Sequence, residues 1–255
     1  MESNGSFYMT LPSNACLDVF PGNTLSSYKI NLPKTLYLKQ DYEVALAEIH
    51  YPVSWRTFAD INSYSFSIHD IPTNTFQPVY VPIAFYEDVP EFVKAINSTL
   101  KTFFEIEGAK NDSIVIDCNK LEQKVRVRTS PNYNIQFSPE ACQVLGLEYT
   151  WYSNVSDWGR YIYNISRGFH ALYVYCSVVE PQIVGDVFAP LLRTVAAEQK
   201  RGQYIIKAYG KPHYVRVNAK EINTIEINIK DDTGANVSFT FGKVICKLHF
   251  QQRSL

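Results

Sequence analysis

Signals for a metal site, a redox motif or a membrane segment are missing from this sequence. The cysteines are odd in number and widely spaced, with no C-x-x-C pair: Cys16, Cys118, Cys142, Cys176 and Cys246. This pattern favours free thiols in a reducing compartment over a zinc site or a disulfide framework. No apolar run approaches the roughly 18 residues of a membrane-spanning helix, so we expect no membrane span. The first residues show no basic stretch followed by an apolar run, so we expect no signal peptide and synthesis inside the cell.

Charge is scarce and nearly balanced. Charged residues make up 19% of the chain and the formal net charge is −1. A dedicated nucleic-acid-binding protein normally carries a clear basic excess, so we expect no dedicated nucleic-acid site. The basic residues between 200 and 220 fit either a contact patch or solvated strand edges, where charge discourages aggregation. They are Lys200, Arg201, Lys207, Lys211, Arg216 and Lys220. So few charges also suggest that a partner covers part of the surface.

Sequence motifs for catalysis are absent as well. The chain contains no G-x-S-x-G and no H-E-x-x-H. Cys246 and His249 are three residues apart on an expected strand, so their side chains point to opposite faces and cannot bind one ion together. The remaining histidines are isolated: His50, His69, His170 and His213. We therefore expect no catalytic residue, no metal site and no cofactor. An enzyme of the cupin type, which needs a His/Glu metal cluster, is the weakest alternative.

Aromatic residues, in contrast, are abundant and favour β structure. They make up 14% of the chain, with 18 Tyr and 15 Phe, and such side chains fit a pleated, half-buried surface. Ile225, Ile227 and Ile229 alternate with polar residues, the period of a strand with one buried face. A turn over 231–234 is expected next because Asp and Gly favour tight reversals, and alternation resumes over 237–241 and 244–250. The end of the chain is therefore predicted to be an antiparallel meander.

Short strands cut by Pro, Asn and Gly are expected over the first eighty residues. The predicted strands cover 6–11, 16–20, 27–32, 42–52, 64–68 and 78–83. In the strongest of them, 42–52, Val44 and Leu46 share one face whereas Ile49 and Tyr51 share the other. This change of face predicts either a β-bulge near Ala47 or a strand buried on both sides.

The pattern changes at residue 84, where a helix is expected. Its apolar stripe consists of Phe92, Val93, Ile96, Leu100, Phe103 and Phe104. Asp88 with Glu91 resembles a capping box, and Pro90 lies in the first turn. Strands over 113–118, 124–129 and 133–137 follow, and then a short helix from the Ser138 cap to Gly146. We predict an α+β subdomain over 84–148, inserted into an otherwise all-β chain formed by residues 1–83 and 149–255.

Aromatic density is highest over 149–163. The candidate site residues there are Trp151, Tyr152, Trp158, Tyr161 and Tyr163. Tyr and Trp are enriched in protein interfaces and on platforms that stack sugars, but they are also common in cores. Three interpretations stay open for this segment: core packing, a subunit interface, or a ligand platform.

Three stretches carry a resemblance to a known family. They are "FYMTLPSNACLDVFPGNTLSSYKINLP" leading into "YEVALAEIHYPVSW", then "ALYVYCSVVEPQIVGDVFAPLLRTV", then "INTIEINIKDDTGANVSFTFGKVICKLHF". Together they resemble the minor capsid, or penton, proteins of Maverick/Polinton elements and adintoviruses. The resemblance implies an all-β jelly-roll β-sandwich, with the α+β insertion commonly facing outward.

The same resemblance implies a structural role in a virion and no enzyme activity. Such penton proteins form homopentamers at the fivefold vertices of an icosahedral shell built from a double-jelly-roll major capsid protein. At 255 residues the chain is too short to be that partner. A fivefold ring closes head to tail, so its two interface patches must differ. The alternative function is a jelly-roll module that binds a glycan or a host receptor through Trp151, Tyr152 or Trp158.

Overall fold

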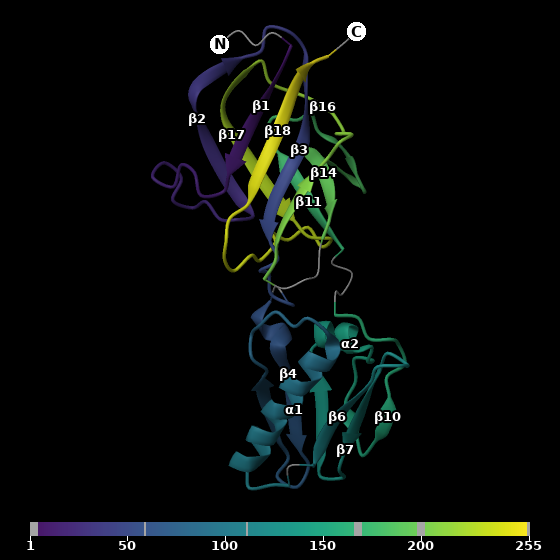
Figure 1. Cartoon of the computed structure of the whole chain (residues 1–255). Coiled ribbons are helices and arrows are strands. Elements are labelled where there is room, and N and C mark those ends of the chain that lie inside the picture. Colours follow the sequence, from purple (N-terminus) through teal and green to yellow (C-terminus); the bar gives the residue numbers. More distant parts are fainter. Residues whose placement is uncertain (1–4, 59, 111, 166–169, 198–201, 254–255) are drawn as a thin grey trace. The chain divides into compact units, whose positions relative to one another are not determined.

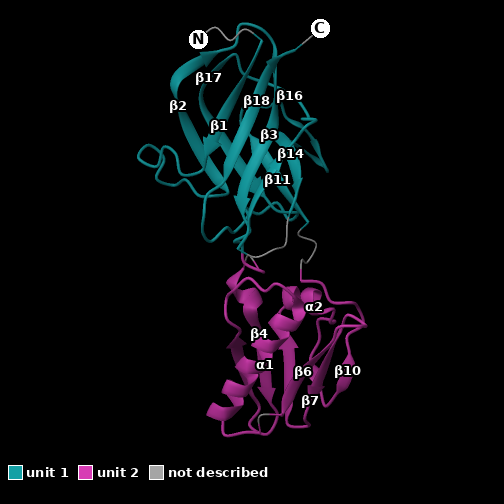
Figure 2. Cartoon of the chain, viewed as in Figure 1, with its two compact units in different colours: residues 1–55, 168–255 teal, residues 56–167 magenta. Residues whose placement is uncertain are grey.

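The computed structural model describes residues 5–253 except 59, 111, 166–169 and 198–201. The chain forms two compact units, shown in Figure 2. Unit 1 consists of Met1–Trp55 together with Gly168–Leu255, and unit 2 of Arg56–Arg167. The continuous unit 2 is therefore inserted into the discontinuous unit 1. Its bounds are wider than the 84–148 range that the sequence indicates.

Unit 1 contains two main antiparallel sheets, labelled in Figure 1. The first has the order β1 (Ser6–Pro12), β18 (Ile245–Gln252), β3 (Tyr42–Pro52) and β15 (Tyr204–Ala208), and β16 (Val215–Arg216) also pairs with β3. The second has the order β14 (Leu191–Ala196), β11 (Ala171–Cys176), β17 (Glu221–Lys230) and β2 (Ser27–Tyr37). A separate hairpin joins β12 (Gln182–Val184) to β13 (Val187–Ala189).

The order in which the chain visits the two sheets is that of a jelly roll. Successive strands β1, β2 and β3 lie in alternate sheets, and β15, β17 and β18 alternate in the same way. Each sheet presents one apolar face to the other, as in other β-sandwiches, and the core is closed between them. Unit 2 is inserted between β3 and β11. The fold class expected from the resemblance, an all-β jelly roll with an α+β insertion, is confirmed.

The predicted terminal meander is wrong in its topology, although its outer strands are correct. Ile225, Ile227 and Ile229 are buried on β17, and Cys246 and Leu248 are buried on β18. However, β17 pairs with β2 and β11, whereas β18 pairs with β1 and β3. The segment between them crosses from one sheet to the other, so residues 237–241 form only an isolated bridge, Trp55 to Phe239, instead of a strand.

The change of face within β3 is explained by a β-bulge at Ala47. On the partner strand Lys247 pairs with Glu48 and Leu248 pairs with Leu46, so Ala47 is skipped in the register. The extra residue returns the later half of the strand to the core face. As a result Val44, Leu46, Ile49 and Tyr51 are all buried, and the bulge predicted near this position is confirmed.

Two predictions in the first third of the chain are wrong. Residues 16–20 form consecutive turns, held by hydrogen bonds from the backbone N–H groups of Val19 and Phe20 to the carbonyl of Cys16. The strand expected to end before Pro33 continues to Tyr37 as β2. Because β2 is an outer strand and its pairing with β17 is irregular beside Pro33, the missing N–H of the proline is tolerated there.

The buried thiols of unit 1 belong to its core. Burial raises the pKa of both Cys176 and Cys246 to about 12, so these thiols stay protonated at neutral pH. The Tyr28 hydroxyl lies in the same core and donates a hydrogen bond to the Leu11 carbonyl at 3.1 Å. All five cysteines are free, as the sequence predicted.

Unit 2 is an α+β unit with two small antiparallel sheets and two helices. One sheet has the order β5 (Thr75–Tyr80), β4 (Ser65–Asp70), β8 (Tyr133–Phe137) and β9 (Tyr152–Ser153). The other has the order β10 (Ser156–Trp158), β7 (Lys124–Thr129) and β6 (Ile114–Asn119). The helices are α1 (Val89–Ile106) and α2 (Pro139–Leu145), and a 3₁₀ turn covers Ile61–Tyr64.

The apolar stripe of α1 enters the core of this unit. Phe92, Val93, Ile96, Leu100 and Phe104 are buried with residues from both small sheets, and Phe103 is partly buried. The helix begins as predicted, because the Asp88 carboxylate accepts a hydrogen bond from the Glu91 N–H at 2.7 Å. Asn97 fixes the helix to β6, since its side chain exchanges two hydrogen bonds with the backbone of Ile116. The segment 56–83 belongs to this unit because β4 pairs with β8, which lies far along the chain.

Candidate interaction surfaces

The aromatic segment 149–163 divides between core and surface. Tyr152 and Tyr163 pack against the core of unit 2. The Tyr152 hydroxyl accepts a hydrogen bond from the Glu148 N–H and donates one to the Glu148 carbonyl, each at 3.1 Å. Burial raises the pKa of this hydroxyl to about 12. These two tyrosines are therefore structural, in line with the core interpretation.

Trp158, in contrast, belongs to the surface of unit 2. It is 41% exposed on β10 and stacks on Arg126, whose guanidinium carbon is 4.9 Å from the ring centroid. Arg126 and Arg128 both donate hydrogen bonds to the Asp117 carboxylate, at 2.7 to 3.2 Å. Although partial burial opposes the effect, these bonds keep the pKa of Asp117 below its usual value. Trp158 thus rests on an ordered ion-pair network.

Tyr161 is exposed as well. Its backbone N–H donates to the Gly146 carbonyl at 3.1 Å, and the guanidinium of Arg160 lies 5.7 Å from its ring centroid. Arg160 is itself paired with Glu148 at 2.9 Å. The five predicted aromatics therefore do not form one continuous platform in the described structure.

Trp151 contributes to an aromatic patch, which we define as His69, Phe76 and Trp151. The rings of His69 and Phe76 are stacked, with centroids 4.1 Å apart and an interplanar angle of 1°. Trp151 meets both rings edge-on, at 6.2 and 5.7 Å. The imidazole is held at both nitrogens, by Asn74 and by Asn134. Phe76 is 61% exposed, so this rigid patch presents an aromatic surface to solvent.

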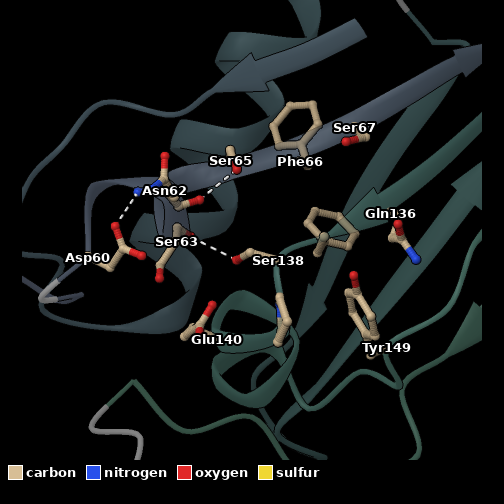
Figure 3. Close-up of a pocket in the computed structure, with 12 residues that line it drawn as sticks. Asp60, Asn62, Ser63, Ser65, Phe66, Ser67, Gln136, Ser138, Glu140 and Tyr149 are labelled. Carbon is tan, nitrogen blue, oxygen red and sulfur yellow. Dashed lines mark hydrogen bonds between the residues drawn. The ribbon is translucent and has the colours of Figure 1, made fainter. Parts of the chain in front are cut away.

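A shallow polar hollow of about 260 Å³ is lined by residues that include parts of β4 and β8, and Figure 3 shows these residues. Ser65, Ser67 and His69 alternate with buried residues on β4, so the hollow and the aromatic patch lie along one sheet face. Ser138 donates to the Ser63 carbonyl at 3.0 Å and caps α2 by accepting from the Ala141 N–H at 3.1 Å. Further hydrogen-bonding groups around the hollow come from Asp60, Gln136, Glu140 and Tyr149.

The polar groups around the hollow can bind a ligand through hydrogen bonds. No group of three or more metal-ligating side chains was found among the described residues. Neither helix in the part of the chain that the structure describes has an apolar stretch long enough to span a membrane. Sequence reasoning singled out Trp151 but missed His69 and Phe76. Those two residues lie on the β4–β5 hairpin, more than seventy positions before Trp151. The pairing of β4 with β8 and of β8 with β9 brings them near it.

Three of the basic residues of the 200–220 region make separate contacts on unit 1. Lys207 donates to the Ala196 carbonyl at 2.6 Å, Arg216 lies 3.8 Å from Glu180, and Lys220 pairs with Asp41 at 2.5 Å. Lys200 and Arg201 lie outside the described residues. The described members thus favour the interpretation as solvated strand edges over a single basic patch.

Comparisons with known proteins identify a structural counterpart. No family model and no curated protein matches the sequence. Among solved structures, the chain is similar to the penton protein of mavirus, with a TM-score of 0.55 and 14% sequence identity. The match covers 97% of this chain and 100% of the mavirus protein. At this identity the likeness shows a common fold, and it extends over both units.

Proposed function

We propose that this chain is a structural capsid protein of the penton type, without enzyme activity. The observation that carries the proposal is the full-length structural match to a viral penton protein. The match covers the jelly roll together with the insertion between β3 and β11, so it is more specific than a jelly roll alone. The early resemblance to penton proteins of Maverick/Polinton elements and adintoviruses came from different observations and supports the same role.

In this role the protein forms homopentamers at the fivefold vertices of an icosahedral virion. Its partners are further copies of itself and a double-jelly-roll major capsid protein. Unit 1 provides the assembly domain, since its two sheets close a core and leave the strand edges and loops free for neighbours. Unit 2, which is inserted into unit 1 and has its own hydrophobic core, faces outward from the shell.

We expect the purified protein to have a solution mass of about 146 kDa, which is five times the chain mass of 29.2 kDa. The measurement is mass photometry or light scattering over a dilution series, because a ring dissociates by mass action at low concentration. A protein that remains at 29.2 kDa throughout, and that is also left out of shells when co-expressed with its major capsid protein, would contradict the proposal.

A second candidate function is receptor attachment through unit 2. It is favoured by the exposed aromatic patch beside the hollow, because aromatic faces stack on sugar rings while hydroxyl, amide and carboxylate groups bind sugar hydroxyls. Among the residues that the structure describes, those that line the hollow include Asp60 and Glu140 but no Lys or Arg. The hollow therefore suits neutral saccharides better than sialylated or sulfated ones.

A glycan array with the intact protein tests this second function. We expect binding that is lost in Trp151→Ala and Phe76→Ala and retained in Trp158→Ala, since Trp158 lies on the other small sheet. Ile106→Ala serves as the matched control, because Ile106 is an exposed apolar residue of unit 2 outside the patch. A silent array would count against attachment to glycans and leave the capsid role untouched.

A further inference from the structure

The hairpin β12–β13 is unusual because it displays large apolar side chains outside both sheets of unit 1. Ile183 is 73% exposed, Val187 54% and Phe188 76%. Ile183 and Phe188 are direct partners in the hairpin register, so their side chains share one face. Adjacent exposed apolar side chains of this size mark an interaction site more often than a solvated surface.

Contacts within the chain also fix the backbone of the hairpin. Gly185 adopts a φ of +63° in the two-residue turn, a conformation that glycine reaches without strain. At the base, the Cys176 N–H donates to the Pro190 carbonyl at 3.0 Å, and the Gln182 side chain donates to the Leu191 carbonyl. An element that is already rigid loses little entropy on docking.

A matching apolar hollow of about 340 Å³ lies elsewhere on unit 1. It is formed by the 13–26 loop and the start of β2, and its walls include Val19, Phe20, Pro21 and Tyr28. Figure 1 shows this loop projecting from the flank that carries β2. Asn23 fixes the loop, since its amide donates to the Lys29 carbonyl at 2.9 Å and accepts from the Lys29 N–H at 2.9 Å.

The hairpin and the hollow belong to opposite edges of one sheet. In the order β14-β11-β17-β2, the hollow lies beside the outer strand β2 and the hairpin leads directly into the outer strand β14. A ring that closes by rotation joins two different patches on opposite flanks of each subunit, whereas a twofold dimer uses one self-complementary patch. The placement of hairpin and hollow therefore fits a ring.

Charge agrees with this pairing. Asp186 is exposed at the tip of the hairpin turn. Lys29 lines the hollow, pairs with Glu226 at 3.3 Å, and keeps half of its side chain exposed. Opposite charges at the rim of an apolar contact favour one docking register over others.

We infer that the hairpin face bearing Ile183 and Phe188 docks into the hollow at Val19–Lys29 of a second copy of this chain. Repeated around the ring, this head-to-tail contact joins the subunits. The inference rests on the proposed capsid function and names the residues of its fivefold contact.

Cysteine cross-linking tests the contact directly. The variant carries Val19→Cys and Phe188→Cys in a background where the two part-exposed native thiols are replaced, Cys16→Ser and Cys118→Ser. With a short bismaleimide we expect a ladder of covalent species on a denaturing gel that ends at five chains, because a closed ring offers no further free end. The control pair, Leu121→Cys with Phe188→Cys, is expected to stay monomeric, since Leu121 is 97% exposed on a turn of unit 2.

A single substitution provides a second readout. Phe188→Ser is expected to reduce the solution mass from about 146 to 29.2 kDa, with the thermal unfolding of the chain unchanged because the side chain is in solvent. Leu121→Ser, which removes an equally exposed apolar side chain, is expected to leave the mass unchanged.

The outcomes separate the inference from the proposed function. A wild-type pentamer that persists in Phe188→Ser, with no ladder from the cysteine pair, overturns the contact and leaves the capsid role standing. Cross-linking that stops at dimers overturns the head-to-tail arrangement. A wild-type monomer with no cross-linking at any concentration overturns both the contact and a ring formed by the protein alone.

Discussion

Replacing Gly146 with alanine is expected to destabilise unit 2 by roughly 2–5 kcal/mol. Gly146 ends α2 with a φ of +70°, a left-handed conformation that costs an L-residue about 1–2 kcal/mol. In addition, a Cβ at this position would overlap the Tyr161 carbonyl oxygen and lie 2.9 Å from the carbonyl of Ile162. All of these contacts are backbone atoms, so relief requires the 161–162 segment to move away from the end of the helix.

Gly108 offers a matched control for this substitution. It follows the end of α1 with a φ of +68°, but a Cβ there would meet nothing within 4 Å. Gly108→Ala therefore carries the backbone cost alone, about 1–2 kcal/mol. Urea unfolding followed by tryptophan fluorescence compares the two variants, since Trp151 and Trp158 both lie in unit 2. Equal decreases in the free energy of unfolding of the two variants would show that the close backbone contacts at Gly146 contribute nothing to the effect.

The second large effect is expected from Phe92→Ala, which should destabilise unit 2 by about 3–5 kcal/mol. Phe92 is 1% exposed, and its ring lies 5.5 Å from that of Phe58 and 5.0 Å from that of Tyr86. Truncation leaves a cavity among aromatic rings that cannot easily collapse. Because each unit has a core formed from its own residues, we expect the protection of unit 1 to be unchanged.

Hydrogen exchange read peptide by peptide measures this effect. In Phe92→Ala, amides of residues 56–165 should exchange faster, and those of β3, β17 and β18 should not. The matched variant in unit 1 is Phe250→Ala, whose ring is buried and stacks on Phe7 with centroids 4.9 Å apart. In Phe250→Ala, the amides of β3, β17 and β18 should exchange faster, and those of residues 56–165 should not. Faster exchange throughout both units in either variant would show that the chain unfolds as one cooperative body.

Local sequence patterns predicted the elements better than their pairing. Period-2 alternation located β17 and β18 correctly, because burial on one sheet face fixes the identity of every second residue. The pattern does not state which strand lies alongside, so a third strand over 237–241 was predicted between β17 and β18, where the chain crosses from one sheet to the other. Helix ends were predicted well because caps are local: Asp88, Ser138 and Gly146 interact with residues a few positions away.

The candidate surfaces were predictable only in part. Trp151 was recognised from aromatic density, but a patch that joins β4 and β5 to the segment after α2 depends on long-range pairing. The apolar hairpin lies within one of the three stretches that carry the family resemblance. The sequence of this stretch does not indicate that the hairpin side chains are exposed to solvent. Ile183, Val187 and Phe188 have the composition of a core strand, and only the structure shows that their side chains are exposed.

The pairing of β1 with β18 has a consequence for biosynthesis. Ser6 is the partner of Gln251, and β3 also pairs with β18. The strands β1 and β3 therefore cannot complete their sheet until β18 has been synthesised. Unit 2 is continuous in sequence and can fold on the ribosome as soon as residue 167 has emerged. Unit 1 is completed only after β18 has emerged. A chain interrupted between residues 168 and 245 thus carries a folded insertion on an open jelly roll.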